Sequence, residues 1–178
     1  MTKKFIYLFL ALALPGLIFW FLKKFGRNEF AVPVYFENGI QTDSICNMNV
    51  PGIYSVPDSV LSKVGIRKDA PAKLVVIYPF IKDDLSEVVR VAEKYIPDRV
   101  ETVVVSGIPN NPDGKLRRVF FDYDQFGPIV YCLLRVEEPW SVVMLDEHNR
   151  IRGFYDGSRR DEMDRLDLEL SILLKKYE

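Results

Sequence analysis

Histidine and cysteine are scarce in this chain, whose 178 residues include one histidine and two cysteines. Structural zinc sites need clusters of such side chains, and disulfide-stabilised small domains need several cysteine pairs, so both classes are excluded. Neither sign of charge is in excess, because the chain has 24 basic and 25 acidic residues and a net charge of -1. We therefore expect no nucleic-acid partner.

Internal repeats and low-complexity tracts are absent as well. A chain of this length is sufficient for one domain with a sizeable core. The exception to this globular composition is a long uncharged run at the N-terminus.

This run comprises the 18 residues from Phe5 to Leu22, with lysines on both sides. Its length is near the roughly 20 residues that a helix needs to cross a bilayer. A cleaved signal peptide is the alternative, but its apolar region usually has about 7 to 15 residues. We therefore predict a retained membrane anchor over residues 1–27, with a transmembrane helix at about 5–22 and the lipid bilayer as a partner.

The best-defined pattern lies near the C-terminus and predicts a β-hairpin. Ser141 to Leu145 is a short apolar run typical of a buried strand, Asp146 to Asn149 has turn composition, and Arg150 to Tyr155 alternates polar and apolar residues.

A helix is predicted after this hairpin. Ser158 is the expected N-cap, and Asp161 and Glu162 place negative charge in the first turn. Apolar residues then recur at spacings of three and four, which predicts one stripe packed against a sheet: Met163, Leu166, Leu170, Leu173 and Tyr177. A hairpin followed by a packed terminal helix is typical of the end of a thioredoxin-like domain.

The segment before this domain, residues 28–56, is punctuated by proline and glycine and predicts an irregular lead-in with edge strands. A short helix should begin at Pro57 and end at Gly65. We assign residues 57–178 to the thioredoxin-like domain, an α/β fold with a mixed sheet and flanking helices.

The centre of the predicted sheet consists of Lys73 to Tyr78 and Glu101 to Ser106, both buried apolar runs. An amphipathic helix from Asp83 to Tyr95 lies between them, which predicts a parallel crossover. Leu116 to Phe126 stays ambiguous, and Ile129 to Val136 fits either a strand or the end of a helix.

These residues resemble the Sco/SenC family of membrane-anchored, thioredoxin-like copper chaperones over about residues 50–178. The resemblance rests on the frame KLVVIYPF, an amphipathic helix, ETVVVSGIPNNPD, and VVMLDEHNRIRGFYDG before a terminal helix. Its most specific piece is LDEHNRIRGFYDG. The resemblance implies a domain outside the cytoplasmic membrane that acts in cytochrome oxidase assembly through copper delivery or thiol chemistry.

The family's ligands are missing from this sequence. Two thiolates of a Cys-x-x-x-Cys motif and one histidine would bind copper, but the matching segments here are Tyr78 to Asp84 and Glu137 to Trp140. Neither segment contains a cysteine or a histidine. The acidic pairs in them, Asp83-Asp84 and Glu137-Glu138, have a simpler interpretation as solvated or helix-capping residues.

Three further side chains are weighed as metal or redox groups. Cys46 and Met48 could touch Cu(I), Cys132 is most simply a small buried hydrophobe, and the two cysteines could instead form a disulfide. His148 lies in the predicted turn and is interpreted as solvated. We assign no catalytic, cofactor-binding or metal-ligating residue and expect no cofactor, with copper as the candidate if there is one.

Two functions therefore stay open. The first is a non-catalytic binding or assembly module of a membrane complex, such as a respiratory complex. The second is an active copper or thiol protein that uses Cys46, Met48 and Cys132 in an atypical arrangement. The charges that flank the anchor balance and do not choose a side. The resemblance places the C-terminal domain in the periplasm, as a single-pass protein of the cytoplasmic membrane.

Overall fold

The computed structural model describes residues 4, 13–21, 23, 31–41, 45–78, 85–95, 99–109, 116–137 and 139–175. The chain divides into two compact units, Met1–Ala31 and Val32–Glu178. In the first unit, residues 13–21 are helical. Within the described part of the chain, no helix combines the length and apolar character that crossing a bilayer requires. Residues 5–12 and 22 of the predicted anchor lie outside the described residues.

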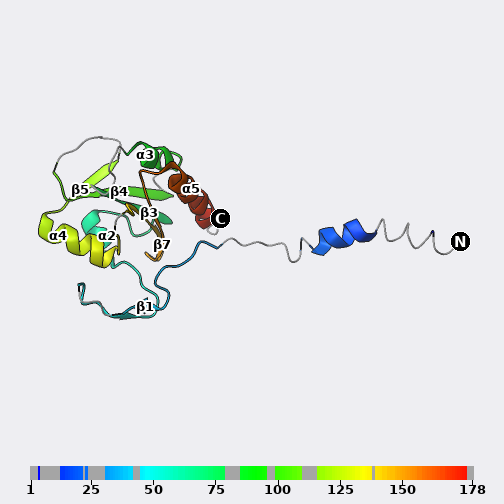
Figure 1. Ribbon diagram of the computed structural model, residues 1–178, viewed down its shortest axis with the longest axis horizontal. Helices are drawn as coiled ribbons and strands as arrows, with labels where there is room; N and C mark the ends of the chain where they lie inside the picture. The colour runs from blue at the N-terminus through cyan, green and yellow to red at the C-terminus, as the bar shows by residue number, and fades with distance from the viewer. Residues whose placement is uncertain are drawn as a thin grey trace. The chain divides into compact units, whose positions relative to one another are not determined.

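The second unit is built on a five-stranded mixed sheet (Figure 1). Its strands are β3 (Ala72–Tyr78), β4 (Val100–Ser106), β5 (Arg117–Phe120), β6 (Val142–Asp146) and β7 (Ile151–Tyr155). The spatial order is β5-β4-β3-β6-β7. Strands β3, β4 and β5 are parallel, whereas β6 runs antiparallel to β3 and β7 antiparallel to β6. The predicted parallel pair and the C-terminal hairpin are therefore confirmed.

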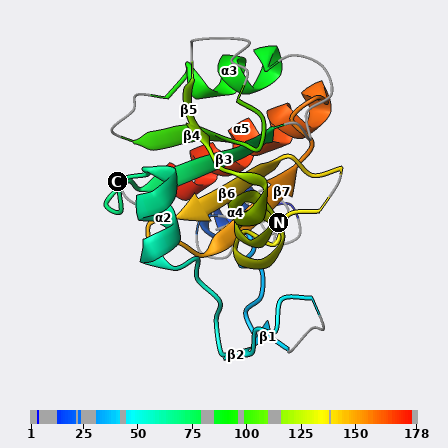
Figure 2. The same ribbon diagram turned by 90° about the vertical axis from the view of Figure 1, so that its left-hand side faces the viewer.

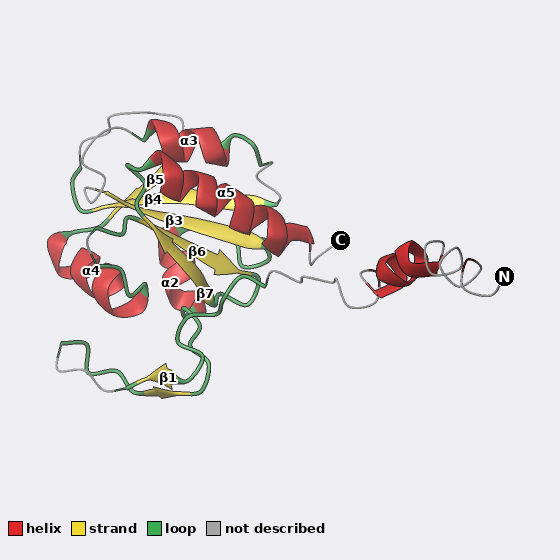
Figure 3. Cartoon of the chain, turned by 45° about the vertical axis from the view of Figure 1, so that its right-hand side comes forward, coloured by secondary structure: helices red, strands yellow, loops and turns green. Residues whose placement is uncertain are grey.

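Helices cover both faces of this sheet (Figure 3). They are α2 (Asp58–Val64), α3 (Ser86–Ala92), α4 (Tyr123–Gly127), the π-helix η1 (Pro128–Leu133) and α5 (Arg160–Lys175). Residues of α3 and α5 share one buried cluster with Leu74 and Val76 of β3. Residues of α2 and η1 share a second cluster with Val75 and Ile77. Because alternate residues of β3 enter opposite cores, its sequence is a continuous apolar run. The mixed α/β class is confirmed.

The lead-in forms a small ribbon beside the sheet, visible in Figure 2. Strands β1 (Gly39–Ile40) and β2 (Val50–Pro51) pair antiparallel. Gly39 has φ +86°, and an added Cβ would lie 2.1 Å from the carbonyl oxygen of Val50, so only glycine fits there. Ile40, Tyr54 and Val56 are all buried in the second cluster. This segment therefore contributes to the core.

The terminal helix differs from expectation at its first turn. Helix α5 begins at Arg160, and the Ser158 hydroxyl donates a hydrogen bond of 2.6 Å to Asp156 Oδ1. The backbone N–H of Ser158 donates to the same oxygen. Asp156 thus closes a local turn that precedes the helix, and the prediction of Ser158 as the N-cap is wrong. The apolar stripe is confirmed at Met163, Leu166, Leu170 and Leu173, whereas Tyr177 lies outside the described residues.

The two ambiguous segments are now defined. Leu116 to Phe126 contains β5 and most of α4, and Ile129 to Leu133 continues the helix as part of η1. The backbone N–H of Leu134 donates to the carbonyl of Ile129, the five-residue spacing of a π-helix. Arg135, with φ +56°, follows directly. The apolar run from Ile129 to Leu133 is therefore helical.

Two matched substitutions on α5 test the packing of its stripe. Leu170 is fully buried, whereas Leu168 is 61% exposed on the same helix. We expect Leu170→Asp to unfold the domain, because an unpaired buried charge costs several kcal/mol against a typical total of about 5 to 15. Leu168→Asp should leave the thermal midpoint within a few degrees, since surface substitutions change stability by about 0.5 kcal/mol or less. Equal midpoints for both variants, measured by circular dichroism, would contradict the docked helix.

Candidate functional site

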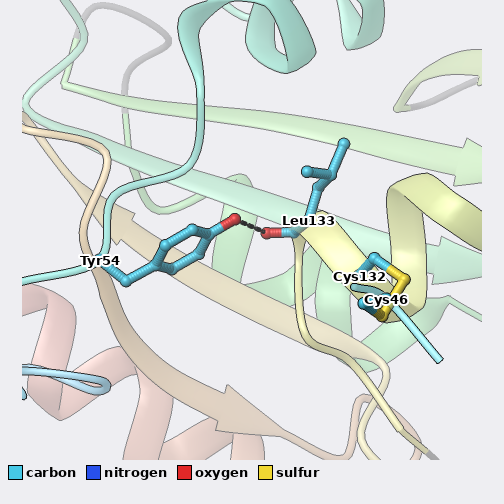
Figure 4. The surroundings of a disulfide bond; sticks show 4 residues. All are labelled: Cys46, Tyr54, Cys132 and Leu133. Carbon is cyan, nitrogen blue, oxygen red and sulfur yellow. Dashed lines mark hydrogen bonds between the residues drawn. A yellow bond between two sulfur atoms is a disulfide. The ribbon is translucent and has the colours of Figure 1, made fainter. Parts of the chain in front are cut away.

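The two cysteines form a disulfide between Cys46 and Cys132, with Cα atoms 5.4 Å apart and a sequence separation of 86 (Figure 4). It joins the lead-in segment to η1. The interpretation of Cys132 as a simple buried hydrophobe is therefore wrong. Pairing was the alternative that the sequence left open.

A hydrogen bond reinforces this connection. The Tyr54 hydroxyl donates to the backbone carbonyl of Leu133 at 2.7 Å, next to Cys132 (Figure 4). Burial raises the pKa of Tyr54 to about 12, although Arg135 opposes the shift. The hydroxyl therefore keeps its proton at neutral pH and remains a donor. Covalent and polar links thus hold the segment around β1 and β2 against η1.

The disulfide changes what these residues can do chemically. Both sulfurs are bonded to each other, so neither is available as the thiolate that Cu(I) binding needs. Met48 packs partly buried against the second core cluster. Among the residues that the structure describes, no group of three or more His, Cys, Asp or Glu side chains could hold a metal ion.

His148 lies in the β6–β7 turn with a side chain 64% exposed, and its Nε2 is 3.3 Å from Glu147 Oε1. Its backbone N–H donates to the carboxylate of Asp146. These contacts are those of a turn residue.

The described residues of the two segments compared with the ligand positions in the sequence analysis include Tyr78 and Trp140, at one end of the sheet. The backbone N–H of Ile77, near the end of β3, donates to the carbonyl of Ser141. Tyr78 and Trp140 therefore flank neighbouring strand ends. Glu137 is exposed, whereas residues 79–84, which include Asp83 and Asp84, and Glu138 lie outside the described residues.

This end of the sheet carries exposed apolar side chains, which we call the carboxyl-edge surface. Strands β4 and β5 end here, and β6 begins here because it is antiparallel to β3. A Cβ at Gly107 would lie 3.2 Å from the Phe126 ring, so α4 also packs over the end of β4. The exposed members are Ile108 (41%), Phe120 (48%), Tyr123 (90%), Tyr131 (44%) and Trp140 (39%).

The sequence analysis missed this surface. Its members come from four separate segments, and none belongs to a periodic pattern. The one available signal is the aromatic density of the segment VFFDYDQF, residues 119–126. Exposed apolar side chains at one end of a sheet are candidates for contact with a partner.

Comparisons with known proteins add little to this geometry. The chain matches no protein-family model and no curated protein. One similar solved structure is a "putative electron transfer protein from Aquifex aeolicus VF5". It has 11% sequence identity and a TM-score of 0.44, over 59% of this chain and 82% of the other. A likeness this distant supports no functional argument.

The disulfide should contribute strongly to stability because it closes a long loop. A loop of this length removes about 4 to 5 kcal/mol of chain entropy from the unfolded state. We expect the double variant Cys46→Ser, Cys132→Ser to lose several kcal/mol in urea unfolding. Reductant should lower the stability of the native chain by a similar amount and leave the double variant unchanged. A native chain that is insensitive to reductant would contradict this role.

Proposed function

We propose that this chain is a membrane-anchored, non-catalytic domain of thioredoxin-like fold, related to the Sco/SenC proteins, that binds a partner during assembly of a membrane complex. The observation that carries the proposal is the carboxyl-edge surface. Exposed aromatic side chains stand there, at the sheet end where the related family keeps its copper ligands.

The sheet order supports the thioredoxin-like assignment. A parallel β3-α3-β4 unit is followed by β5, α4 and η1 and then by an antiparallel hairpin and a terminal helix, with β3 at the centre of the sheet. Helices α3 and α5 lie on one face of this sheet. Fold and chemistry are separable, so the scaffold persists without the family's thiols and imidazole.

The disulfide supports a location outside the cytoplasm. Disulfides persist in oxidising compartments such as the periplasm and are rare in the cytosol. The uncharged run of Phe5 to Leu22 supports a single anchor, with the C-terminal domain on the periplasmic side.

The partner in this proposal is a protein subunit with its own exposed apolar side chains. Aromatic residues are enriched in the cores of protein interfaces, where they contribute large contact areas. Tyr123 is the most exposed member and Trp140 the largest, and they come from different elements. Exposed aromatic side chains suit a protein contact, whereas small-molecule sites are concave pockets.

The alternative is an active copper or thiol-redox protein that uses Cys46, Met48 and Cys132. Reduction of the disulfide would release two neighbouring thiols, which is the observation in its favour. Copper analysis of the reduced chain distinguishes the two functions. One tight equivalent that is lost in a Cys46→Ser variant would favour this alternative.

Site-specific photocrosslinking in cells tests the partner-binding proposal. We expect a photoreactive phenylalanine analogue in place of Tyr123 or Trp140 to give a discrete adduct with a membrane-complex subunit, identified by mass spectrometry. The same analogue at Leu168, which is also exposed but lies on α5, should give none. Adducts of equal yield from all three positions, or from none, would count against the carboxyl-edge surface.

Membrane topology is tested separately. The chain should stay in the membrane fraction after a high-salt wash, because apolar burial is insensitive to ionic screening. Protease added to spheroplasts should degrade the domain, and both cysteines should resist alkylation until a reductant is added. A domain that survives until lysis, while a known periplasmic protein is digested, would place it in the cytoplasm.

A further inference from the structure

Arg118 is a half-buried residue whose guanidinium nitrogens are shielded and without a hydrogen-bonding partner among the described residues. Its Nε, Nη1 and Nη2 atoms are all shielded from solvent, and none donates a hydrogen bond within the described part of the chain. Its neighbour Arg117 differs, because its guanidinium donates to the carbonyl of Gly65 and lies 3.6 Å from a Glu101 oxygen. Of these two neighbouring arginines, only Arg118 lacks a hydrogen-bond acceptor among the described residues.

The strand register places Arg118 on the sheet face that α3 and α5 cover. Arg118 lies opposite Val104 of β4, which lies opposite Val76 of β3. Val76 and Val104 both belong to the cluster that α3 and α5 bury. Two residues beyond Val76, the Tyr78 ring centre is 5.1 Å from the Arg118 guanidinium carbon. The guanidinium therefore reaches across β4 to the end of β3.

The tyrosine ring satisfies this cation only in part. An arginine keeps its charge at all physiological pH values and offers five N–H donors. A ring face attracts the charge but does not replace the oxygen acceptors that these donors had in water. A buried charged group without acceptors is strongly unfavourable, so an acceptor is expected at this position.

We propose that Arg118 binds an oxyanion, a phosphate or carboxylate group, beside Tyr78 at the carboxyl end of the parallel strands. A planar guanidinium matches two oxygens of either group in a bidentate pair. Ligands of open α/β sheets bind at the carboxyl ends of the strands. This proposal goes beyond the partner proposed above, because it rests on the guanidinium of Arg118 and not on the exposed side chains of the carboxyl-edge surface.

Nitrogen-15 NMR of the arginine side chains tests the site directly. The full-length chain, kept in a non-ionic detergent, is titrated with sodium phosphate or with sodium succinate. Sodium chloride at matched ionic strength is the control for screening. We expect the Arg118 Nε–H resonance to shift and saturate with one of the two oxyanions and not with chloride. The anion that saturates it identifies the phosphate or the carboxylate as the preferred group.

Three variants make the test specific. Arg118→Gln should abolish saturable binding of the oxyanion in calorimetry. Arg118→Lys keeps the positive charge but lacks the paired N–H donors of a guanidinium, so it should weaken binding roughly tenfold or more. Arg117→Gln removes a neighbouring charge on the opposite face and should leave the affinity within about twofold, as expected for a rim charge. If Arg118→Gln does not fold, titration of the native chain and of the Arg118→Lys variant still tests whether Arg118 binds the oxyanion.

Two results would overturn the proposal. The first is an Arg118 resonance that moves equally with chloride and with both oxyanions. The second is an Nε–H that is already protected by a carboxylate of the chain itself and does not respond to added anion. Unchanged crosslinking from Tyr123 in the Arg118→Lys variant would then show that partner binding stands without the anion site.

Discussion

The carboxylate of Asp146, fully buried at the end of β6, holds together the end of the sheet where β3 begins. It accepts hydrogen bonds from the backbone of His148 and Arg150 and from the guanidinium groups of Arg150 and Arg152. Lys73, also fully buried, donates to the Asp146 carbonyl at 3.1 Å. Burial lowers the pKa of Lys73, and the negative charge of Asp146 opposes this. Removing one member of this ion network would leave a buried charge uncompensated, which costs about 3 to 5 kcal/mol of folding stability.

This network lies at the opposite end of β3 from the proposed sites. Asp146 pairs in register with Ala72, the first residue of β3, whereas Tyr78 is the last. The two ends are about 20 Å apart, at roughly 3.3 Å per residue. Side chains at the carboxyl end can therefore change with little effect on the ion network. That separation allows the hairpin LDEHNRIRGFYDG to persist while side chains at the other end of the sheet vary.

The parts of the fold that could be predicted from the sequence are those with a periodic or a local signal. The stripe that contains Leu170 and the buried run of β3 were readable from sequence, because burial imposes a period on apolar residues. Helix α2 and its end at Gly65 were readable for a local reason, since a left-handed residue there favours glycine. The Ser158 cap failed because the Ser158 hydroxyl and backbone N–H both donate to the carboxylate of Asp156, two residues earlier. Asp156 and Ser158 can each accept hydrogen bonds from nearby backbone N–H groups, and only the folded chain determines which of them does so.

The sites were less predictable because they depend on contacts between distant segments. Pairing of Cys46 with Cys132 requires η1 to face the lead-in, and its apolar sequence fits a strand equally well. The burial of Arg118 depends on a register across three strands, which no local pattern encodes. In each case the residue types are known from the sequence, but their bonding partners depend on the tertiary fold. The same two sulfur atoms that could bind Cu(I) as thiolates instead form a covalent link, so the redox state of the compartment determines whether metal chemistry is available to this chain.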